Sequence, residues 1–282
     1  MDLQLAGKVV FITGAGGGIG RALATAFAEE DASLALHANR SFAALESRIR
    51  EQSWHNRAIA VRADVTKPAE IADAMERARE RFGRVDVCVA NAGVWTPEAK
   101  HLHEADEDRI RKTIDANLFG ALWTARAFFA ALARSGPRPD GHGAALLLIG
   151  STAGRFGEKL HAEYSVSKAG LYGLLRSLKN EIVDLDPYAR VNLIEPGWTV
   201  THMARPALEQ PGVISHVVRT MPVRQLGRAV DIARAALFLA SPAASRHVSG
   251  EVITVAGGME GRSLWETGQI DEAAIRRRLD EG

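Results

Sequence analysis

Cysteine is almost missing from this sequence, because its 282 residues include only Cys88. One cysteine excludes a disulfide within the chain and fits a reducing compartment, so we expect Cys88 to be a core residue. An excess of charge is missing too, since 35 Lys and Arg stand against 34 Asp and Glu, a net charge of +1. Such a chain lacks the field that attracts nucleic acid or an anionic membrane. We therefore expect a small-molecule partner, no nucleic acid and no membrane.

Long apolar runs and metal motifs are also absent. No stretch of about 18 apolar residues occurs, and the N-terminal segment MDLQLAGKVVFITGAG lacks the basic and apolar regions of a signal peptide. These two absences predict a cytoplasmic protein. There is no H-E-x-x-H and no cysteine cluster, and the segment 101–104 (HLHE) is typical of the solvated start of a helix. We predict no metal site.

Strand and helix patterns alternate along most of the chain. Apolar, β-branched runs indicate strands at 8–13, 33–38, 58–64, 85–90, 144–149, 190–194 and 251–255. Helical patterns separate these runs, and Thr66 is a candidate cap for the third helix, before Pro68. The alternation predicts an α/β fold, a Rossmann-type doubly wound parallel sheet of about seven strands in three α/β/α layers. We expect a single domain over 1–258 with a lid at about 198–226, and a C-terminal extension over 259–282.

A glycine-rich turn follows the first strand directly. Its sequence is Gly14-Ala15-Gly16-Gly17-Gly18-Ile19-Gly20, and a helical pattern begins at its end. A phosphate group needs backbone N–H groups at close range, which side chains would block, and the N-terminus of a helix adds a favourable dipole. The glycines follow G-x-x-x-G-x-G rather than G-x-G-x-x-G, and a flexible linker is the alternative. Its place after a strand favours a nucleotide site at Gly14, Gly16, Gly18, Ile19 and Gly20.

Polar residues follow the next strands and extend this site. Asn39 and Arg40 come after the second strand, and Asp64 and Val65 after the third. In dinucleotide folds an acid after the second strand selects NAD, whereas an Arg there can accommodate the 2′-phosphate of NADP. Ala38 holds the acid's position, so we predict NADP(H) as the preferred cofactor, with NAD(H) possible in its place. Arg40 could equally be a solvated loop residue, and Asp64 a turn former rather than an adenine contact.

Asn91, Ala92 and Gly93 follow the fourth strand and reach the same edge of the sheet. Gly93 permits close approach of the backbone to a ligand. A long helix is predicted next, from about Asp106 to Ala133, and Asn117 interrupts its apolar stripe. A buried Asn must be hydrogen-bonded, so Asn117 either bridges core backbone or holds a water in the site.

The stretch from Ser151 to Lys168 carries the predicted chemistry. Tyr164 and Lys168 are four residues apart, which places them on one face of a helix. A neighbouring ammonium favours the phenolate and is expected to lower the pKa of Tyr164. Ser151 follows the buried strand 144–149 and emerges where open α/β sheets bind ligands. A chance Y-x-x-x-K on a surface helix is the alternative, but together the three groups fit proton transfer to a carbonyl.

These motifs resemble those of the short-chain dehydrogenase/reductase family, over about Leu5 to Gly258. The family's T-G-x-x-x-G-x-G corresponds to 13–20 and its N-A-G to 91–93. The catalytic tetrad of the family matches Asn117, Ser151, Tyr164 and Lys168, with the family's usual 13-residue step from Ser to Tyr. Within the family the chain looks most like a 3-oxoacyl-acyl-carrier-protein reductase. Two departures are Ala90, where many members have Asn, and a longer tail after Gly258.

The resemblance implies a role for each of these residues. Tyr164 would donate a proton to the carbonyl oxygen, Ser151 would steady that oxygen, and Asn117 would hold a water linked to Lys168. Lys168 would also bind the ribose of the cofactor. Cofactor contacts are implied for Asn91, Ala92, Gly93, Tyr164, Lys168, Pro196, Gly197, Thr199 and Thr201. The family also implies a homotetramer, paired through the helices that carry Asn117 and Tyr164, and we expect Phe128, Phe129, Leu171, Leu174 and Leu178 to contribute.

The predicted function is an NADP(H)-dependent oxidoreductase that interconverts a ketone and a secondary alcohol. The alternative is a cofactor-binding regulator of the same fold, which the complete tetrad disfavours. An apolar substrate wall is expected from Val94, Trp95, Phe156, Trp198 and Met203, and polar contacts from Arg155, Glu158, Lys159 and His161. These residues leave three substrate classes open: a 3-oxoacyl thioester, a sugar acid and a cyclic ketone.

Overall fold

Seven parallel strands form the central sheet, in the order β3-β2-β1-β4-β5-β6-β9. Their bounds are β1 Val9–Ile12, β2 Ser33–Ala38, β3 Ala58–Arg62, β4 Val87–Ala90, β5 Ala145–Ile149, β6 Arg190–Pro196 and β9 Val252–Val255. The order reverses between β1 and β4, which is where doubly wound folds bind their ligands. This computed structural model describes residues 1–280, and it confirms the predicted Rossmann-type sheet.

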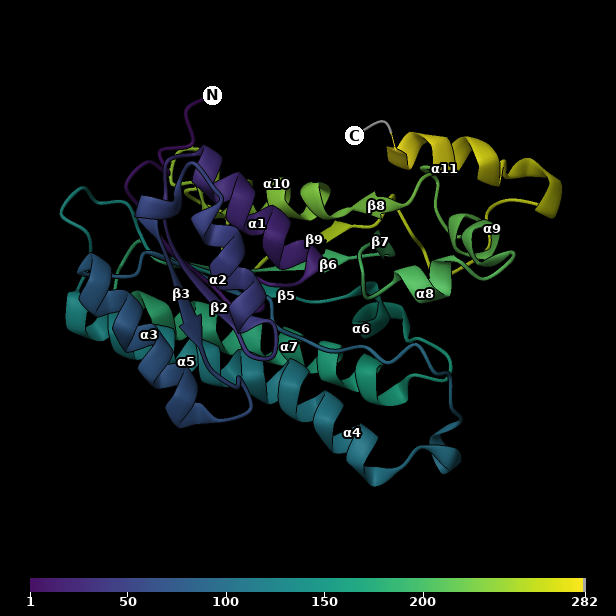
Figure 1. Cartoon of the computed structure of the whole chain (residues 1–282), viewed down its shortest axis with the longest axis horizontal. Helices are drawn as coiled ribbons and strands as arrows, with labels where there is room; N and C mark the ends of the chain where they lie inside the picture. The colour runs from purple at the N-terminus through teal and green to yellow at the C-terminus, as the bar shows by residue number, and fades with distance from the viewer. Residues whose placement is uncertain (281–282) are drawn as a thin grey trace.

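Helices cover both faces of the sheet, giving three layers (Figure 1). One face carries α1 (Gly18–Glu29), α2 (Phe42–Arg50) and α10 (Ala229–Ala240), and the other carries α3 (Pro68–Phe82), α5 (Gly120–Ser135) and α7 (Ala162–Glu181). Central strands such as β1 and β5 are buried along their whole length. Burial on both faces explains why their sequences are continuous apolar runs rather than alternating ones.

The long helix after β4 is not regular. It begins at α4 (Glu107–Ile114), where the Asp106 carboxylate caps the end by accepting from the Arg109 N–H at 2.7 Å. A π-helical turn at Asp115–Phe119 then separates α4 from α5. Such turns carry an extra residue, and they are frequent at functional sites. Asn117 lies within this turn and is buried.

The stretch Glu107–Ser135 is long and apolar enough to cross a membrane by length and composition alone. Half of its most apolar window, 50%, is buried inside the protein. Phe128 and Leu132 of α5 lie in the core between the sheet and α3. A core helix meets the same criteria, so this stretch is only weak evidence for a membrane span.

Helix α3 begins one residue later than its predicted cap implies. Lys67, not Thr66, occupies the N-cap position, and Pro68 is the first helical residue. Thr66 instead donates from its backbone N–H (3.0 Å) and its hydroxyl (2.8 Å) to the Asp64 carboxylate. Asp64 therefore organises the turn after β3, as one of the two sequence interpretations held.

The segment predicted as a lid contains short regular elements. Strand β7 (Thr199–Val200) pairs with β8 (Gly227–Arg228), and the chain between them forms α8 (Arg205–Leu208) and α9 (Val213–Val218). The chain after Gly258 returns to this segment through α11 (Glu272–Asp280), which lies over α9 and α8 (Figure 1). The side chain of Ile275 is buried there. It completes a third apolar cluster with Leu208, Ile214, Val217, Val218, Met221 and Leu226.

Candidate active site

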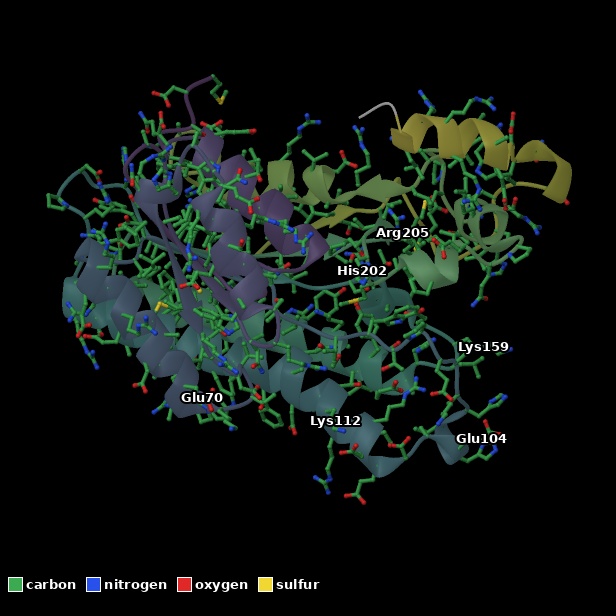
Figure 2. The ribbon with its side chains drawn as sticks, in the orientation of Figure 1. Glu70, Glu104, Lys112, Lys159, His202 and Arg205 are labelled. Atoms are coloured by element: carbon green, nitrogen blue, oxygen red, sulfur yellow. The ribbon has the colours of Figure 1, made fainter. Side chains whose placement is uncertain are left out.

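A pocket of about 1400 Å³ lies at the carboxyl ends of the strands. The predicted residues that line it are Gly14, Gly16, Gly18, Ile19, Gly20, Asn39, Arg40, Asp64, Val65, Asn91, Ala92, Gly93, Ser151, Tyr164, Lys168, Pro196, Gly197, Thr199 and Thr201. Lys112 of α4 lies on one side of this pocket, and His202 and Arg205 of the segment predicted as a lid lie on the other (Figure 2). The chain thus brings every predicted site residue except Asn117 to one cavity.

The glycine turn forms a cradle that only glycine can build. Gly14 has φ +66°, and a Cβ added there would lie 2.9 Å from Ala92 Cα. A Cβ on Gly20 would lie 2.2 Å from the Gly14 carbonyl oxygen, and one on Gly18 would lie 2.8 Å from the Thr201 side chain. This bare backbone at the N-terminus of α1 fits the diphosphate of a dinucleotide.

His37 supports the glycine turn from within β2. Its Nδ1 accepts the Gly14 N–H at 3.2 Å, so the proton sits on Nε2, which donates to the Ala63 carbonyl at 2.9 Å. Burial lowers the pKa of His37, which keeps the ring neutral and able to accept. His37 was not among the predicted site residues, although a histidine inside the apolar run SLALHA is a usable signal.

Two arginines reach the end of the pocket that follows β2. Arg40 is exposed, and its guanidinium makes no hydrogen bond or ion pair with residues 1–280. Arg21 of α1 also lines the pocket and donates from Nε to the Gly16 carbonyl at 2.8 Å. Arg21 stands just after the glycine turn and was not among the predicted cofactor residues, which included Arg40 as their only arginine.

Asp64 and Asn39 face each other in the same region. Burial acts to raise the pKa of Asp64, but hydrogen bonds from Thr66 and Asn39 outweigh it and hold that pKa below its usual value. The carboxylate is therefore ionised at neutral pH, and it fixes the Asn39 amide beside Arg40.

Ser151 and Tyr164 meet at the centre of the pocket. Ser151 lies just after β5 and caps α6 (Thr152–Phe156), where its Oγ accepts the Ala153 N–H at 3.2 Å. Burial raises the pKa of Tyr164 to about 12, although a hydrogen bond from Ser151 lowers it, and the negative charge of Glu158 adds to the rise. This direction is opposite to the lowering predicted from Lys168. At neutral pH the phenol carries its proton and can donate it.

Lys168 is buried one turn along α7 from Tyr164. Its ammonium lies 5.9 Å from the centre of the Tyr164 ring and donates to the Ile149 carbonyl at 2.9 Å. Burial lowers the pKa of Lys168 to about 8, so the group remains mostly charged at neutral pH. The predicted pairing on one helical face is present, at a separation that permits electrostatic influence rather than a direct bond.

Asn117 acts beneath the pocket rather than in it. Its Oδ1 accepts the Val94 N–H at 2.7 Å, and its Nδ2 donates to the Val94 carbonyl at 2.9 Å and to Ser167 Oγ at 3.0 Å. Of the two sequence interpretations, the bridge to core backbone is therefore the one observed. A Cβ on Gly93 would lie 3.0 Å from Asn117 Oδ1, which explains the glycine at that position.

Of the four polar residues predicted for the substrate wall, only Glu158 lines the pocket. The apolar residues Val94, Trp95, Phe156, Trp198 and Met203 all line the pocket, together with Glu158. The other three polar candidates do not line it. Arg155 forms an ion pair with the buried Glu195 at 3.1 Å. His161 is buried behind Trp95, with 5.2 Å between the ring centres. Lys159 is exposed and points outwards (Figure 2). Within the described chain, no three His, Cys, Asp or Glu side chains are grouped to hold a metal ion.

Comparison with known proteins identifies relatives along most of the chain. Residues 14–260 match the family model described as enoyl-(acyl carrier protein) reductase. The L-rhamnose 1-dehydrogenase (NAD(P)(+)) of a Sphingomonas species is 32% identical over 90% of this chain and 97% of its own length.

Solved structures of similar enzymes superpose closely on this fold. A short-chain dehydrogenase/reductase from Brucella melitensis, described as glucose/ribitol dehydrogenase, gives a TM-score of 0.80 with 30% identity, over 90% of this chain and 97% of that one. A 7α-hydroxysteroid dehydrogenase complexed with NADH and 7-oxoglycochenodeoxycholic acid gives 0.80 with 30% identity, over 93% and 98%. The family model stops at residue 260, before the segment that includes α11.

Proposed function

The chain belongs to the short-chain dehydrogenase/reductase family of oxidoreductases, and we propose that it interconverts a ketone and a secondary alcohol with NADP(H). The observation that carries the proposal is the meeting of Ser151, Tyr164 and Lys168 in one pocket with the glycine cradle. A proton donor, a hydroxyl and a cation then surround the place where a carbonyl group can bind.

The residues present fit a nicotinamide dinucleotide. The diphosphate would lie on the glycine turn, the adenosine end beside Asn39, Arg40, Asp64 and Val65, and the nicotinamide end near Pro196, Gly197, Thr199 and Thr201. The reduced cofactor supplies a hydride to the carbonyl carbon. Asn91 and Gly93 line the pocket between the two ends, where their backbone allows close approach.

Tyr164 completes the reduction by moving a proton. Its phenol, neutral at pH 7 because burial raises its pKa to about 12, donates the proton to the carbonyl oxygen. The carbonyl oxygen would thereby gain the proton that balances the hydride from the bound cofactor, and Tyr164 would be left as phenolate. The Lys168 ammonium, 5.9 Å from the ring, stabilises that phenolate, and Ser151 donates to the reacting oxygen. Acid catalysis of this kind is worth about 10²–10⁴-fold.

Asn117 supports this chemistry from below. Its amide joins the π-helical turn to Val94 in the wall of the pocket and to Ser167 next to Lys168. Asn117 thus holds the surrounding backbone in place. The second lone pair of its Oδ1, which accepts only the Val94 N–H, remains for a water that would relay protons from Lys168.

The preference for NADP(H) rests on Arg40 with Arg21. Both line the pocket near the end of β2, where Ala38 stands in place of the acid that would repel a 2′-phosphate. Two relatives bear on the choice in different ways: the rhamnose enzyme is named for both cofactors, and the hydroxysteroid enzyme was solved with NADH. Arg40 and Arg21 are features of this chain and support the phosphorylated form.

A small-molecule substrate and a homotetramer complete the proposal. Phe128, Leu171 and Leu178 are buried in the chain's own core, so the sequence prediction that they form an interface is wrong. Phe119 and Val166 replace them as interface candidates, because they are exposed on the helices that carry Asn117 and Tyr164.

Cys88 is buried in β4, where burial raises the pKa of its thiol. A cysteine without a disulfide partner fits a cytoplasmic location.

The experiment that tests this function replaces the proton donor. Tyr164→Phe is expected to lower kcat at least about 10²-fold while cofactor binding persists, because only the acid is lost. Absorbance at 340 nm with a panel of ketones and alcohols measures kcat, and calorimetry measures NADPH binding. Tyr188→Phe, which changes an exposed tyrosine, is the matched control. Full activity in Tyr164→Phe would exclude Tyr164 as donor, and NADPH binding without turnover of any substrate would indicate a regulator.

A further inference from the structure

Glu158 is a carboxyl in the pocket that the proposed reaction does not use. It follows α6 and lines the cavity among the apolar residues of the substrate wall. Its carboxyl accepts a hydrogen bond from the Trp95 indole, and its charge acts on the Tyr164 phenol. Burial raises the pKa of Glu158 to about 7. Burying a carboxyl group beside the proton donor costs free energy unless the group is hydrogen-bonded, so we expect the ligand of this pocket to offer hydrogen-bonding groups to Glu158.

The loop that carries Glu158 is held rigidly. The Glu158 N–H donates to Ser165 Oγ at 2.8 Å. Leu160, two residues on, has φ +71°, a conformation that side chains rarely adopt. The buried Arg109 guanidinium lies within 2.7 Å of the Glu163 carboxylate and within 3.5 Å of the Leu160 carbonyl, which it hydrogen-bonds. The backbone around Glu158 is therefore fixed before a substrate arrives.

Aromatic rings form the wall beside this carboxyl. Trp95 and Trp198 both line the pocket, with ring centres 6.1 Å apart and planes at 77°. His161 supports Trp95 from behind at 5.2 Å. A rigid pair of indoles next to a carboxyl presents apolar surface to the C–H face of a ring and an acceptor to its hydroxyl groups.

We propose that the substrate is a hydroxylated ring, a sugar or a related cyclic polyol, whose hydroxyl donates to Glu158 while the ring packs on Trp95 and Trp198. This inference rests on the proposed function and names its substrate class. Bound against an acyl chain or another apolar skeleton, Glu158 would have only the Trp95 indole as partner. A cationic substrate would meet Lys168 and Arg205 in the same pocket. A hydroxyl both donates and accepts, so it pairs with the carboxyl in either protonation state.

The test compares ring ketones that differ in one group. We expect kcat/KM for 4-hydroxycyclohexanone to exceed that for 4-methylcyclohexanone by about 10- to 100-fold, as for a hydrogen bond to a charged group. Glu158→Leu is expected to abolish that ratio, and Glu158→Gln, which is nearly isosteric, to reduce it. Glu80→Leu, an exposed glutamate on α3, is the matched control and leaves the ratio unchanged.

Two results would overturn the inference: the same ratio in Glu158→Leu as in the wild type, or a preference for 4-aminocyclohexanone over both other ketones. Absence of turnover with every ketone would instead contradict the proposed function. Calorimetric binding of 4-hydroxycyclohexanone to Tyr164→Phe, loaded with NADPH, separates these failures because it requires no turnover. Binding that is lost when Glu158→Leu is added supports the subsite, and binding that is unaffected refutes it.

Discussion

Arg40 and Arg21 are the residues on which cofactor choice depends. A charge-assisted hydrogen bond to a phosphate contributes about 1.5–3 kcal/mol, or roughly 10- to 150-fold. Arg40→Ala is therefore expected to lower the ratio of kcat/KM for NADPH to that for NADH by up to that factor. Arg21→Ala is expected to have a smaller effect, because Arg21 Nε is already bonded to Gly16.

The control for both substitutions is Arg77→Ala, which removes an exposed arginine from α3. Steady-state kinetics with both cofactors give the ratio. An unchanged ratio in the double variant Arg21→Ala/Arg40→Ala would make both residues ordinary surface arginines and would end the argument for NADP(H).

Lys168 and Tyr164 predict how the reaction depends on pH. Burial lowers the pKa of Lys168 to about 8, so its positive charge is complete at lower pH and is lost as pH rises through that value. Ketone reduction is then expected to slow above about pH 8, because the phenolate left on Tyr164 loses its stabilising cation. The opposite reaction requires Tyr164 as phenolate, whose pKa of about 12 favours alkaline conditions.

Profiles of kcat against pH in both directions test these signs. Lys168→Arg, which stays charged throughout, is expected to move the loss of reduction to higher pH. A reduction rate that stayed level from pH 7 to 10 in the wild type would show that the charge on Lys168 has no part in the rate.

Local spacing made the catalytic residues predictable, and burial explains what was missed. Ser151, Tyr164 and Lys168 follow from the end of one strand and a four-residue step on one helix. The pKa of Tyr164 had the wrong predicted direction because it depends first on burial by a pocket wall whose residues come from several distant parts of the chain, and then on the charge of Glu158. His37 and Arg21 act through contacts with the glycine turn that no spacing rule contains.

At the scale of elements, α11 is expected to hold the lid. Ile275 is buried against α8 and α9, Glu272 accepts the Ser215 N–H at 2.8 Å, and Trp265 donates to the Met221 carbonyl at 2.6 Å. Ile275→Asp places a charge in this cluster at a cost of several kcal/mol. We expect it to free the segment 205–218 and to raise KM by about 10-fold or more, because a segment that closes over the pocket would position the substrate.

Steady-state kinetics and limited proteolysis of the lid measure this effect. Ala273→Asp introduces the same charge at an exposed position of the same helix and serves as the control. Equal KM values and equal cleavage of the lid in the two variants would mean that α11 packs on the lid without restraining it.

Strands and helices whose apolar residues recur at regular spacing were predicted well, whereas irregular segments were not. The predicted second strand has the bounds of β2, and the third predicted helix is present as α3. The π-helical turn was missed because its five residues keep an apolar pattern that also suits a regular helix. The short helices of the lid were missed because Ile275, which buries their apolar side chains, lies far away in the sequence.

At the scale of the whole molecule, the helices around the π-helical turn are expected to pair with a second copy. Phe119 is 42% exposed and stacks on Trp123, and Val166 on α7 is 60% exposed. Val166→Glu with Phe119→Glu would place charges in such an interface and is expected to dissociate the tetramer. Light scattering measures the mass, and Ala44→Glu, at an exposed position of α2, is the control. A wild-type mass near the 30.4 kDa of one chain would refute the tetramer.

The π-helical turn also limits how the length of this chain can change. Losing one residue from Asp115–Phe119 would restore a regular α-helix and improve its local hydrogen bonding. The same deletion would leave the orientation of α5 relative to α4 nearly unchanged, because an i→i+5 turn uses about one residue more than an α-helical turn of 3.6 residues. Phe128 and Leu132 would therefore stay in the core, but the turn that sets Asn117 against Val94 would be lost. The extra residue thus serves the pocket rather than the packing of the helix, and its loss would cost the site before it cost the fold.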